Sequence, residues 1–500
     1  MIPPLKPLRS VLQIYICMQV ACVLATGCSG AGRSDGRIVV VADDSSDRVT
    51  ARLVFGYDPA QFPAGTAWMF AEVLAGTNSN GMNSEVGELT SLGASLAATA
   101  EREILRVDLT FPKTATSHIA RLVGQRLSRL QIDSSRIDEL RLIQHASLDS
   151  LRHEVDWLVQ SAFWNAAYQG TPYSLPPTGS DSSIELIRSA DVDSFRSRFI
   201  TRGNYVLGLA GSVGSLDAAT FDDQIQELLP AGGPANRIPP ALPPSGLEVA
   251  IVELPNVPTT TISVGCSAPH LSTDTAAMVL AMTVALEAGP GLSITGIDQS
   301  IRVERGLAEL VCGRTSWINT TQTGVDFSGE APSSRDFLMF TVHANPTNAL
   351  YSARIIIKEL ADISNAGISD NEIVQVHYTL EQAISAVTDS PTRMRDRLSR
   401  LWMGIESDSE LLGSRPDALN LTQSRRILRT IIDPKNLWLI AVVPDAERFR
   451  EEILSGMSTY QYPDWVDQGE IRRLDQEYLS YRPYWQAEKI QTSKASDLFR

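Results

Sequence analysis

Cysteine and histidine are scarce in this 500-residue sequence, which has five cysteines and six histidines. Three of the cysteines lie within the first 28 residues, so only Cys266 and Cys312 remain in the rest of the chain. Two cysteines cannot build a disulfide scaffold or a cysteine-rich metal site, and both classes are excluded. The sequence leaves open whether Cys266 and Cys312 form one disulfide or remain buried free thiols.

Basic charge is also in deficit, since 43 lysines and arginines face 58 acidic residues and the formal net charge is −15. Nucleic-acid-binding proteins need clustered positive charge against the phosphate backbone, so we expect no nucleic-acid partner. After the N-terminal segment, no apolar run approaches the ~18 residues that a transmembrane helix requires. The length exceeds what one hydrophobic core usually supports, which predicts at least two domains.

The N-terminus has the pattern of an export signal. Lys6 and Arg9 precede an apolar run that is too short and too close to the terminus for a membrane span, which is typical of a signal peptide over residues 1–27. The run ends in Leu-Ala-Thr-Gly-Cys28, which resembles the lipobox where bacterial lipoprotein signal peptidase cleaves and leaves the cysteine diacylated. We therefore expect a lipid on Cys28, a flexible tether over residues 28–36, and a periplasm-facing location in the cell envelope, at the outer membrane.

Proline and glycine crowd residues 231–247, which predicts a linker between two halves of similar size. We expect an N-terminal domain over residues 37–230 and a C-terminal domain over residues 248–460. The remaining residues, 461–500, are predicted to form an aromatic and polar C-terminal tail.

The order of predicted elements repeats between the two halves. Asn204 and Asn436 each follow a helical phrase and open a buried strand, and their offset of 232 (436 − 204) also holds for the apolar residues around them. This repetition indicates an internal duplication. Strands followed by long helices fit the α+β class, with helices on one face of a mostly antiparallel sheet. The predicted strands are residues 49–56, 93–98, 105–111, 260–265, 307–312 and 337–343, and the predicted helices are residues 64–75, 117–130, 136–168 and 275–286.

Three phrases of the sequence resemble a known family, the pitrilysin/insulinase metallopeptidases (M16), which include the mitochondrial processing peptidase. Gly65–Thr77 is similar to the zinc-helix segment of that family, and Gly170–Tyr173 is similar to its second signature. Ile301–Ala308 resembles the family phrase Ile-Arg-Glu-x-Arg-Gly-Leu-Ala-Tyr. The resemblance implies two homologous M16-type (LuxS/MPP-like) α/β sandwich domains arranged as a clamshell.

The zinc motif of the family does not carry over. Active members have His-x-x-Glu-His on the first helix, because positions i and i+4 share one face and hold zinc while the glutamate activates a water. The matching positions here are Trp68, Ala71 and Glu72. The family's third ligand, a glutamate on a later helix, falls near Gln144 to Asp149, where Asp149 is the only carboxylate. We therefore expect no metal and no other cofactor, and any contact between Glu72 and Asp149 to be a polar pair.

No other residues replace the lost metal site. His145 and His153 are eight positions apart, roughly 12 Å along one helix, which is too far to share an ion. His153 begins a His-Glu-x-x pattern that ends in Trp157 rather than histidine. The other histidines are isolated, and we expect them to be surface or packed residues. The sequence contains no Gly-x-Ser-x-Gly elbow and no phosphate loop.

The second-half phrase supplies substrate contacts in active relatives, where its arginine and tyrosine hold the peptide carbonyl. The arginine is matched by Arg302, but the tyrosine position is Glu309, and an acid there would repel a developing oxyanion. We expect Arg302 and Glu309 at the substrate-binding wall. A salt-bridged structural role for Arg302 is equally consistent with the sequence.

We interpret the chain as a catalytically degenerate M16-like lipoprotein that binds peptides in a clamshell chamber. Its expected partners are an active M16 peptidase subunit, peptides, and a membrane through the lipid. Two alternatives stay open: an active M16-type zinc metalloendopeptidase with atypical ligands, and a structural scaffold subunit of an envelope complex, like the core subunits of respiratory complex III.

The lipid anchor is directly testable. The Cys28→Ala substitution should abolish lipid labelling and release the protein from the membrane fraction, because one diacylated cysteine is the only strong anchor that the sequence predicts. Fatty-acid labelling and cell fractionation measure both effects, with Cys312→Ser as the matched control. Persistence of the Cys28→Ala protein in the membrane would indicate an uncleaved signal anchor or a bound membrane partner instead.

Overall fold

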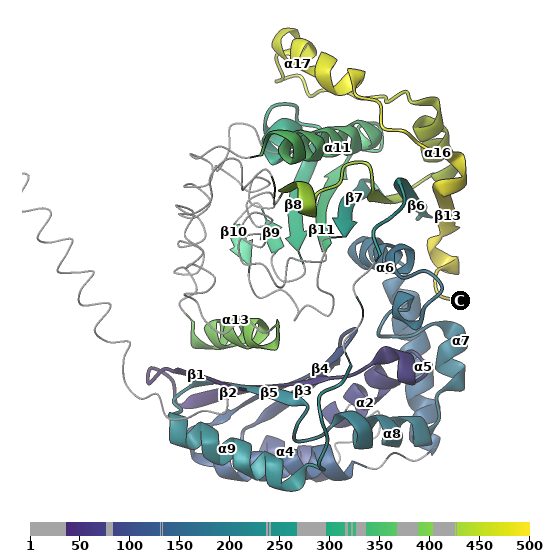
Figure 1. The fold of residues 1–500 in the computed structure, drawn as a ribbon. Coiled ribbons are helices and arrows are strands. Elements are labelled where there is room, and N and C mark those ends of the chain that lie inside the picture. The colour runs from purple at the N-terminus through teal and green to yellow at the C-terminus, as the bar shows by residue number, and fades with distance from the viewer. Residues whose placement is uncertain are drawn as a thin grey trace, which may run out of the picture.

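The structure is a computed structural model of the chain. It describes residues 37–76, 84–130, 132, 134–236, 239, 242–267, 297–315, 319–321, 324–326, 337–367, 389–403, 426 and 428–500. The predicted signal peptide, the lipidation site Cys28, the predicted tether and the predicted helix over residues 275–286 lie outside the described residues. Figure 1 shows two α/β halves, each built around its own sheet.

The first half is built on a five-stranded sheet with the order β1-β5-β2-β4-β3. β1 runs parallel to β5, and the other neighbours are antiparallel. Every second residue of β4 is buried, as the predicted alternation requires. The strands are β1 (Ile38–Ala42), β2 (Arg48–Gly56), β3 (Ser95–Ala100), β4 (Ile104–Pro112) and β5 (Tyr205–Gly211), and the described helices are α2 (Thr66–Ala75), α3 (Ser84–Ser91), α4 (Thr116–Arg129), α5 (Ser134–Leu151), α6 (Val155–Ala167), α7 (Asp181–Leu186), α8 (Ser189–Phe199) and α9 (Ser215–Leu228).

The second half is built on a larger sheet with the order β10-β9-β8-β11-β7-β12-β6-β13. Its strands are β6 (Leu247–Glu253), β7 (Thr260–Ser267), β8 (Ala308–Thr315), β9 (Asn319–Thr321), β10 (Gly324–Asp326), β11 (Phe337–Ala344), β12 (Leu437–Val443) and β13 (Ile490–Lys494). The described helices are α11 (Ala349–Ala366), α13 (Ser390–Met403), α16 (Ala446–Ser455) and α17 (Gln468–Ser480).

The two sheets repeat one topology, which confirms the predicted class of two homologous α+β domains. In the second sheet, β6-β12-β7-β11-β8 follows the order and directions of β1-β5-β2-β4-β3, with one parallel pair and then antiparallel neighbours. β5 begins at Tyr205 and β12 at Leu437, an offset of 232 (437 − 205). The duplication inferred from two short phrases therefore extends over all five strands of the first sheet, while β9, β10 and β13 are additions in the second sheet.

The segment 461–500, predicted to be a tail, is instead part of the second half. β13 adds a parallel strand to β6, and α17 packs against α11. Ile471 and Ile490 are buried in the core of the second half. The prediction was wrong because the polar residues of this segment concealed a sparse set of apolar residues that become buried on folding.

Each sheet has a helix from the other half on its second face. α6 of the first half packs Leu158 and Phe163 against Trp438 of the second sheet. α13 of the second half packs Met394 and Leu398 against the first sheet. Figure 1 shows α13 above the first sheet and α6 below the second. The sequence predicted helices on one face only, whereas the fold buries both faces through this exchange.

The exchange requires a break in the predicted helix over residues 136–168. α5 ends at Leu151, and α6 begins at Val155 after Glu154, whose backbone is extended (φ −94°, ψ 110°). His145 lies on α5 and His153 lies between α5 and α6, so the expectation that both lie on one helix was wrong. No glycine or proline marks the break in the sequence, so only the packing of α6 on the second sheet explains it.

The two cysteines of the body are free thiols. Cys266 lies on β7 and Cys312 on β8, and β11 runs between these two strands. Cys266 is paired with Leu338 and Cys312 with Thr341, so the two cysteines are two strand spacings apart and also three residues out of register. The two spacings alone amount to roughly 9–10 Å, beyond the limit of about 7 Å between Cα atoms that a disulfide can bridge. Burial raises the pKa of the Cys266 thiol to about 12, so this thiol is unreactive at neutral pH. The open choice is resolved in favour of free thiols.

None of the described helices is both long and apolar enough to cross a bilayer.

The contact between α13 and the first sheet depends on a glycine. A Cβ at Gly208 on β5 would overlap the sulfur of Met394, which is fully buried. We expect Gly208→Ala to lower the free energy of unfolding by about 1–3 kcal/mol through overpacking. The cost should largely vanish in a Met394→Ala background, and thermal unfolding of the double-mutant cycle measures it. Gly87→Ala, which meets no atom within 4 Å, is the control. If Gly208→Ala lowered the free energy of unfolding equally with and without the Met394 side chain, the predicted contact between α13 and β5 would be contradicted.

Candidate functional site

Helix α2 carries the positions that match the family's zinc motif. It is bounded by Gly65 and Gly76, whose φ angles are 99° and 75°. Ala71 is buried, and Trp68 packs against the core of the first half. Glu72 follows Trp68 by one turn on the same face. An indole N–H only donates hydrogen bonds and alanine has no donor atom for a metal, so this face offers a metal ion one carboxylate.

The residues of α5 near the expected third ligand make other contacts. Gln144 is fully buried, and its Nε2 donates hydrogen bonds to the carbonyls of Gly65 (3.3 Å) and Thr178 (2.8 Å). Asp149 accepts a hydrogen bond from Nη1 of Arg152 at 2.7 Å. Asp149 therefore forms an ion pair with Arg152, in the turn that follows α5, in place of the polar pair with Glu72 that the sequence suggested. Among the described residues, no group of three or more His, Cys, Asp or Glu side chains is arranged to hold a metal ion.

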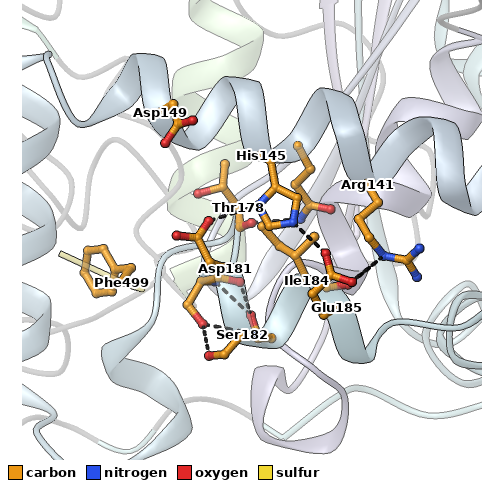
Figure 2. Close-up of polar contacts among 12 residues, drawn as sticks. Arg141, His145, Asp149, Thr178, Asp181, Ser182, Ile184, Glu185 and Phe499 are labelled. Carbon is orange, nitrogen blue, oxygen red and sulfur yellow. Dashed lines mark hydrogen bonds and ion pairs between the residues drawn. The ribbon is translucent and has the colours of Figure 1, made fainter. Parts of the chain in front are cut away.

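His145 lies between two carboxylates of α7, as Figure 2 shows. Its Nδ1 is 2.9 Å from Oδ1 of Asp181, and its Nε2 is 2.9 Å from Oε1 of Glu185. Burial lowers the pKa of His145, but the hydrogen bonds with Glu185 and Asp181 outweigh it and leave the pKa above its ordinary value. Both ring nitrogens are engaged, so His145 acts here as an electrostatic bridge between α5 and α7.

The second-half phrase forms a short π-helix, Gln299–Val303, followed by a turn into β8. Nε and Nη2 of Arg302 donate to the two oxygens of the buried Asp298, at 2.7 and 2.6 Å. These hydrogen bonds raise the pKa of Arg302. Glu309 is exposed near the start of β8. The contacts of Arg302 lie within its own helical turn, which supports the salt-bridged role that the sequence left open, and substrate contact by Arg302 and Glu309 stays a prediction.

Strand β3 forms one edge of the first sheet, beside α2. Within the described residues it pairs only with β4, and α2 packs against it. Its exposed side chains, Ser95, Ala97 and Thr99, are small and alternate along the strand. An edge strand presents unpaired N–H and C=O groups that can hydrogen-bond an added extended peptide. The structure therefore places an edge strand directly beside α2, the helix predicted to match the zinc-helix segment of the family.

Sequence reasoning missed two buried arginines. Nε of Arg305, in the second-half phrase, donates to Asp475 of α17 at 2.9 Å, and both side chains are almost fully buried. Arg152 donates hydrogen bonds to the carbonyls of Leu498 and Phe499. Asp475 is 170 residues away from Arg305, and Leu498 is 346 residues away from Arg152. No local sequence pattern could have revealed either contact.

Comparisons with known proteins give structural relatives only. No family model matches the sequence, and no curated protein is similar to it. The fold is similar to the peptidase M16 inactive domain from Pseudomonas fluorescens, with 16% identity and a TM-score of 0.68 over 82% of this chain and 95% of that chain. It is also similar to a chain of complex III2 from Candida albicans, with 15% identity and a TM-score of 0.62 over 83% of this chain and 96% of that chain.

The periplasmic protease PqqL from Escherichia coli allows the length of this chain to be compared with that of a longer protein. Its first half matches with 15% identity and a TM-score of 0.63, over 91% of this chain and 98% of that structure. Against the whole PqqL chain, with 16% identity and a TM-score of 0.63, this chain matches 91% of its own length and 50% of PqqL. This whole chain, with both of its halves, therefore corresponds in size to half of that protease.

These likenesses define the class of the protein: it has the M16 peptidase fold and is M16-like in architecture, as the sequence motifs predicted. Within that fold the residues present do not fit a zinc ion. Trp68 and Ala71 provide no ligand atoms for a metal ion. The side-chain amide of Gln144 donates its hydrogens to two backbone carbonyls, and Asp149 is paired with Arg152. A tetrahedral zinc site needs three protein ligands, which this arrangement does not supply.

The bridge at His145 predicts a pH-dependent contribution to stability. A pKa raised in the folded state means that protonated His145 stabilises the fold; this contribution is complete below the unfolded pKa, about 6.5, and is lost as the pH rises through the folded pKa. The His145→Gln variant should therefore unfold more easily near pH 5.5–6 by at most about 1 kcal/mol, since solvent screens the cluster. The difference should shrink above neutral pH.

Denaturant unfolding of both proteins across this pH range measures the difference, with His118→Gln as the matched control. His118 is exposed and has a single carboxylate neighbour, Glu88, at 3.1 Å. A difference that grows as the pH rises would contradict the assignment of the bridge.

Proposed function

We propose that the protein is a catalytically degenerate M16-like lipoprotein that captures extended peptides for an active zinc peptidase in the same compartment. The single observation that carries the proposal is the contrast on α2 and β3. The metal-binding positions of α2 are occupied by Trp68, Ala71 and Glu72, while the adjacent edge strand keeps its small, exposed residues. Peptide addition to a strand needs backbone hydrogen bonds and no metal, so it can persist without catalysis.

Partnership with a second M16-type unit is supported by size. This chain matches the first half of PqqL and 50% of the whole PqqL chain. We propose that it associates with a separate second unit of similar size to complete a peptide chamber. An active zinc peptidase subunit is the partner we propose, since it would supply the metal chemistry that α2 here cannot.

An envelope location fits this role. We propose that Cys28 is diacylated and holds the body at the outer membrane, on the periplasmic side. One diacylated cysteine gives membrane attachment without a spanning helix. The body that follows begins with β1 at Ile38, so about ten residues separate the lipid from the first sheet.

A scaffold role is the second candidate, and one observation favours it. The fold is similar to a chain of complex III2 from Candida albicans, an assembly rather than an isolated enzyme. A scaffold would bind its neighbours through its outer surfaces and would not capture peptides at β3. Peptide capture by the purified protein therefore separates the two roles.

The edge of β3 can be blocked by proline. Adjacent residues of a strand point their N–H groups in opposite directions, so of Ala97→Pro and Ala98→Pro, one removes an N–H directed toward β4 and the other an N–H directed away from it. The variant that spares the β3–β4 ladder should keep its thermal stability, because proline is tolerated at an edge. It should also bind a fluorescently labelled, unstructured peptide roughly tenfold more weakly. The other variant should lose stability.

Capture by the unchanged protein should persist in the presence of a metal chelator, because no zinc takes part. Unaltered capture by the stable proline variant would remove β3 from the site. Capture that a chelator abolishes would favour the active-enzyme alternative, and no capture at all would favour the scaffold.

A further inference from the structure

The last residues of the chain cross from the second half to the first. β13 (Ile490–Lys494) belongs to the second sheet, where it runs parallel to β6. The next three residues form a short 3-10 helix, Ala495–Asp497, and Ala495 is buried in the core that α6 shares with the second sheet. Leu498 and Phe499 then reach the first half. Residues 495–499, which directly follow the last residue of β13, therefore connect the second sheet to helices of the other half.

Arg152 binds the backbone of this terminal segment. Its Nε donates to the carbonyl of Leu498 at 3.0 Å, and its Nη2 donates to the carbonyl of Phe499 at 3.2 Å. The guanidinium is itself held by Asp149 at 2.7 Å and by Asp181 at 2.8 Å. Arg152 is buried, so these four partners satisfy a charge that water cannot reach freely.

Phe499 is held by two further contacts. Its carbonyl accepts a hydrogen bond from the backbone N–H of Asp181 at 2.9 Å. Its ring packs edge-on against Trp157, with 5.8 Å between the ring centroids. Figure 2 shows Phe499 beside Asp181, on the side of the cluster where Asp149 lies. Phe499 has a φ of 61°, in the left-handed region that residues other than glycine rarely adopt. A strained terminal residue keeps one conformation only when its contacts hold it there.

These contacts lie at the break between α5 and α6. Arg152 follows the last residue of α5, and Trp157 lies in the first turn of α6. α5 belongs to the first half, whereas α6 is packed on the second sheet. The terminal segment therefore binds both sides of the break through which the chain passes from one half to the other.

We propose that residues 495–499 act as a strap that locks the α5–α6 break and so sets the angle between the two halves. The strap is independent of any metal and of peptide binding at β3. The surface that receives the strap is formed by Arg152, Trp157 and the backbone N–H of Asp181. It binds the main-chain carbonyl groups of Leu498 and Phe499 and the ring of Phe499.

Hydrogen exchange of the purified full chain tests the strap. In a chain truncated after Asp497, the amide of Asp181 loses its acceptor and should exchange roughly tenfold faster or more. If the strap locks the break, amides of residues 152–159 and of β6 should also exchange faster. The β2–β4 and β7–β11 ladders should keep their protection. Arg500→Ala, which removes an exposed side chain paired only with Asp497, is the control and should change none of these.

The Phe499→Ala variant covers the case in which truncation unfolds the chain. It keeps the carbonyls that Arg152 binds and removes only the ring, so it should speed exchange at the break to a smaller extent. Faster exchange confined to Asp181 and the terminal residues, in either variant, would overturn the proposal. The terminus would then be a packed end that does not affect the angle between the halves.

Discussion

The fold depends on a reciprocal exchange of helices between its two halves. Each sheet has two apolar faces, and the described helices of each half cover one face of their own sheet. α6 covers the second face of the other half's sheet through Phe163 and its neighbours, and α13 does the same through Met394. Neither half can bury its sheet alone, because an exposed apolar sheet face is costly in water. The linker, the break after α5 and the docking of the C-terminus all follow from this arrangement.

The positions predicted to match the family's zinc site take part in packing and structural pairing. Trp68 joins the core of the first half, where a ligand would have to face a metal ion. Gln144 uses its amide to tie α5 to the N-terminus of α2. Asp149 supports Arg152 and, through it, the end of the chain. A zinc site at these positions would require Gln144 and Asp149 to give up these contacts, in addition to two histidines that the sequence does not have.

Local patterns predicted the strands well and the helix break poorly. The alternation of residues 105–111 matches β4, which buries every second side chain, because a half-buried strand leaves its period in the sequence. The break at Glu154 left no such trace. Residues 461–500 look polar, yet they contribute β13 and a buried ion pair between Arg305 and Asp475. Their apolar residues are too sparse for a periodic signal and are buried by partners far away in the chain.

The duplication, the class of fold and the lack of a zinc motif could be predicted from the amino-acid sequence, because these features depend on periodicity and on the identity of residues at fixed spacing. Packing over long range sets the exchange of α6 and α13, the pairing of Arg305 with Asp475, and the binding of Leu498 and Phe499 by Arg152. Long-range partners are chosen by where whole elements pack. The sequence around Arg152 does not indicate that its side chain binds the carbonyl group of Leu498, 346 residues further along the chain.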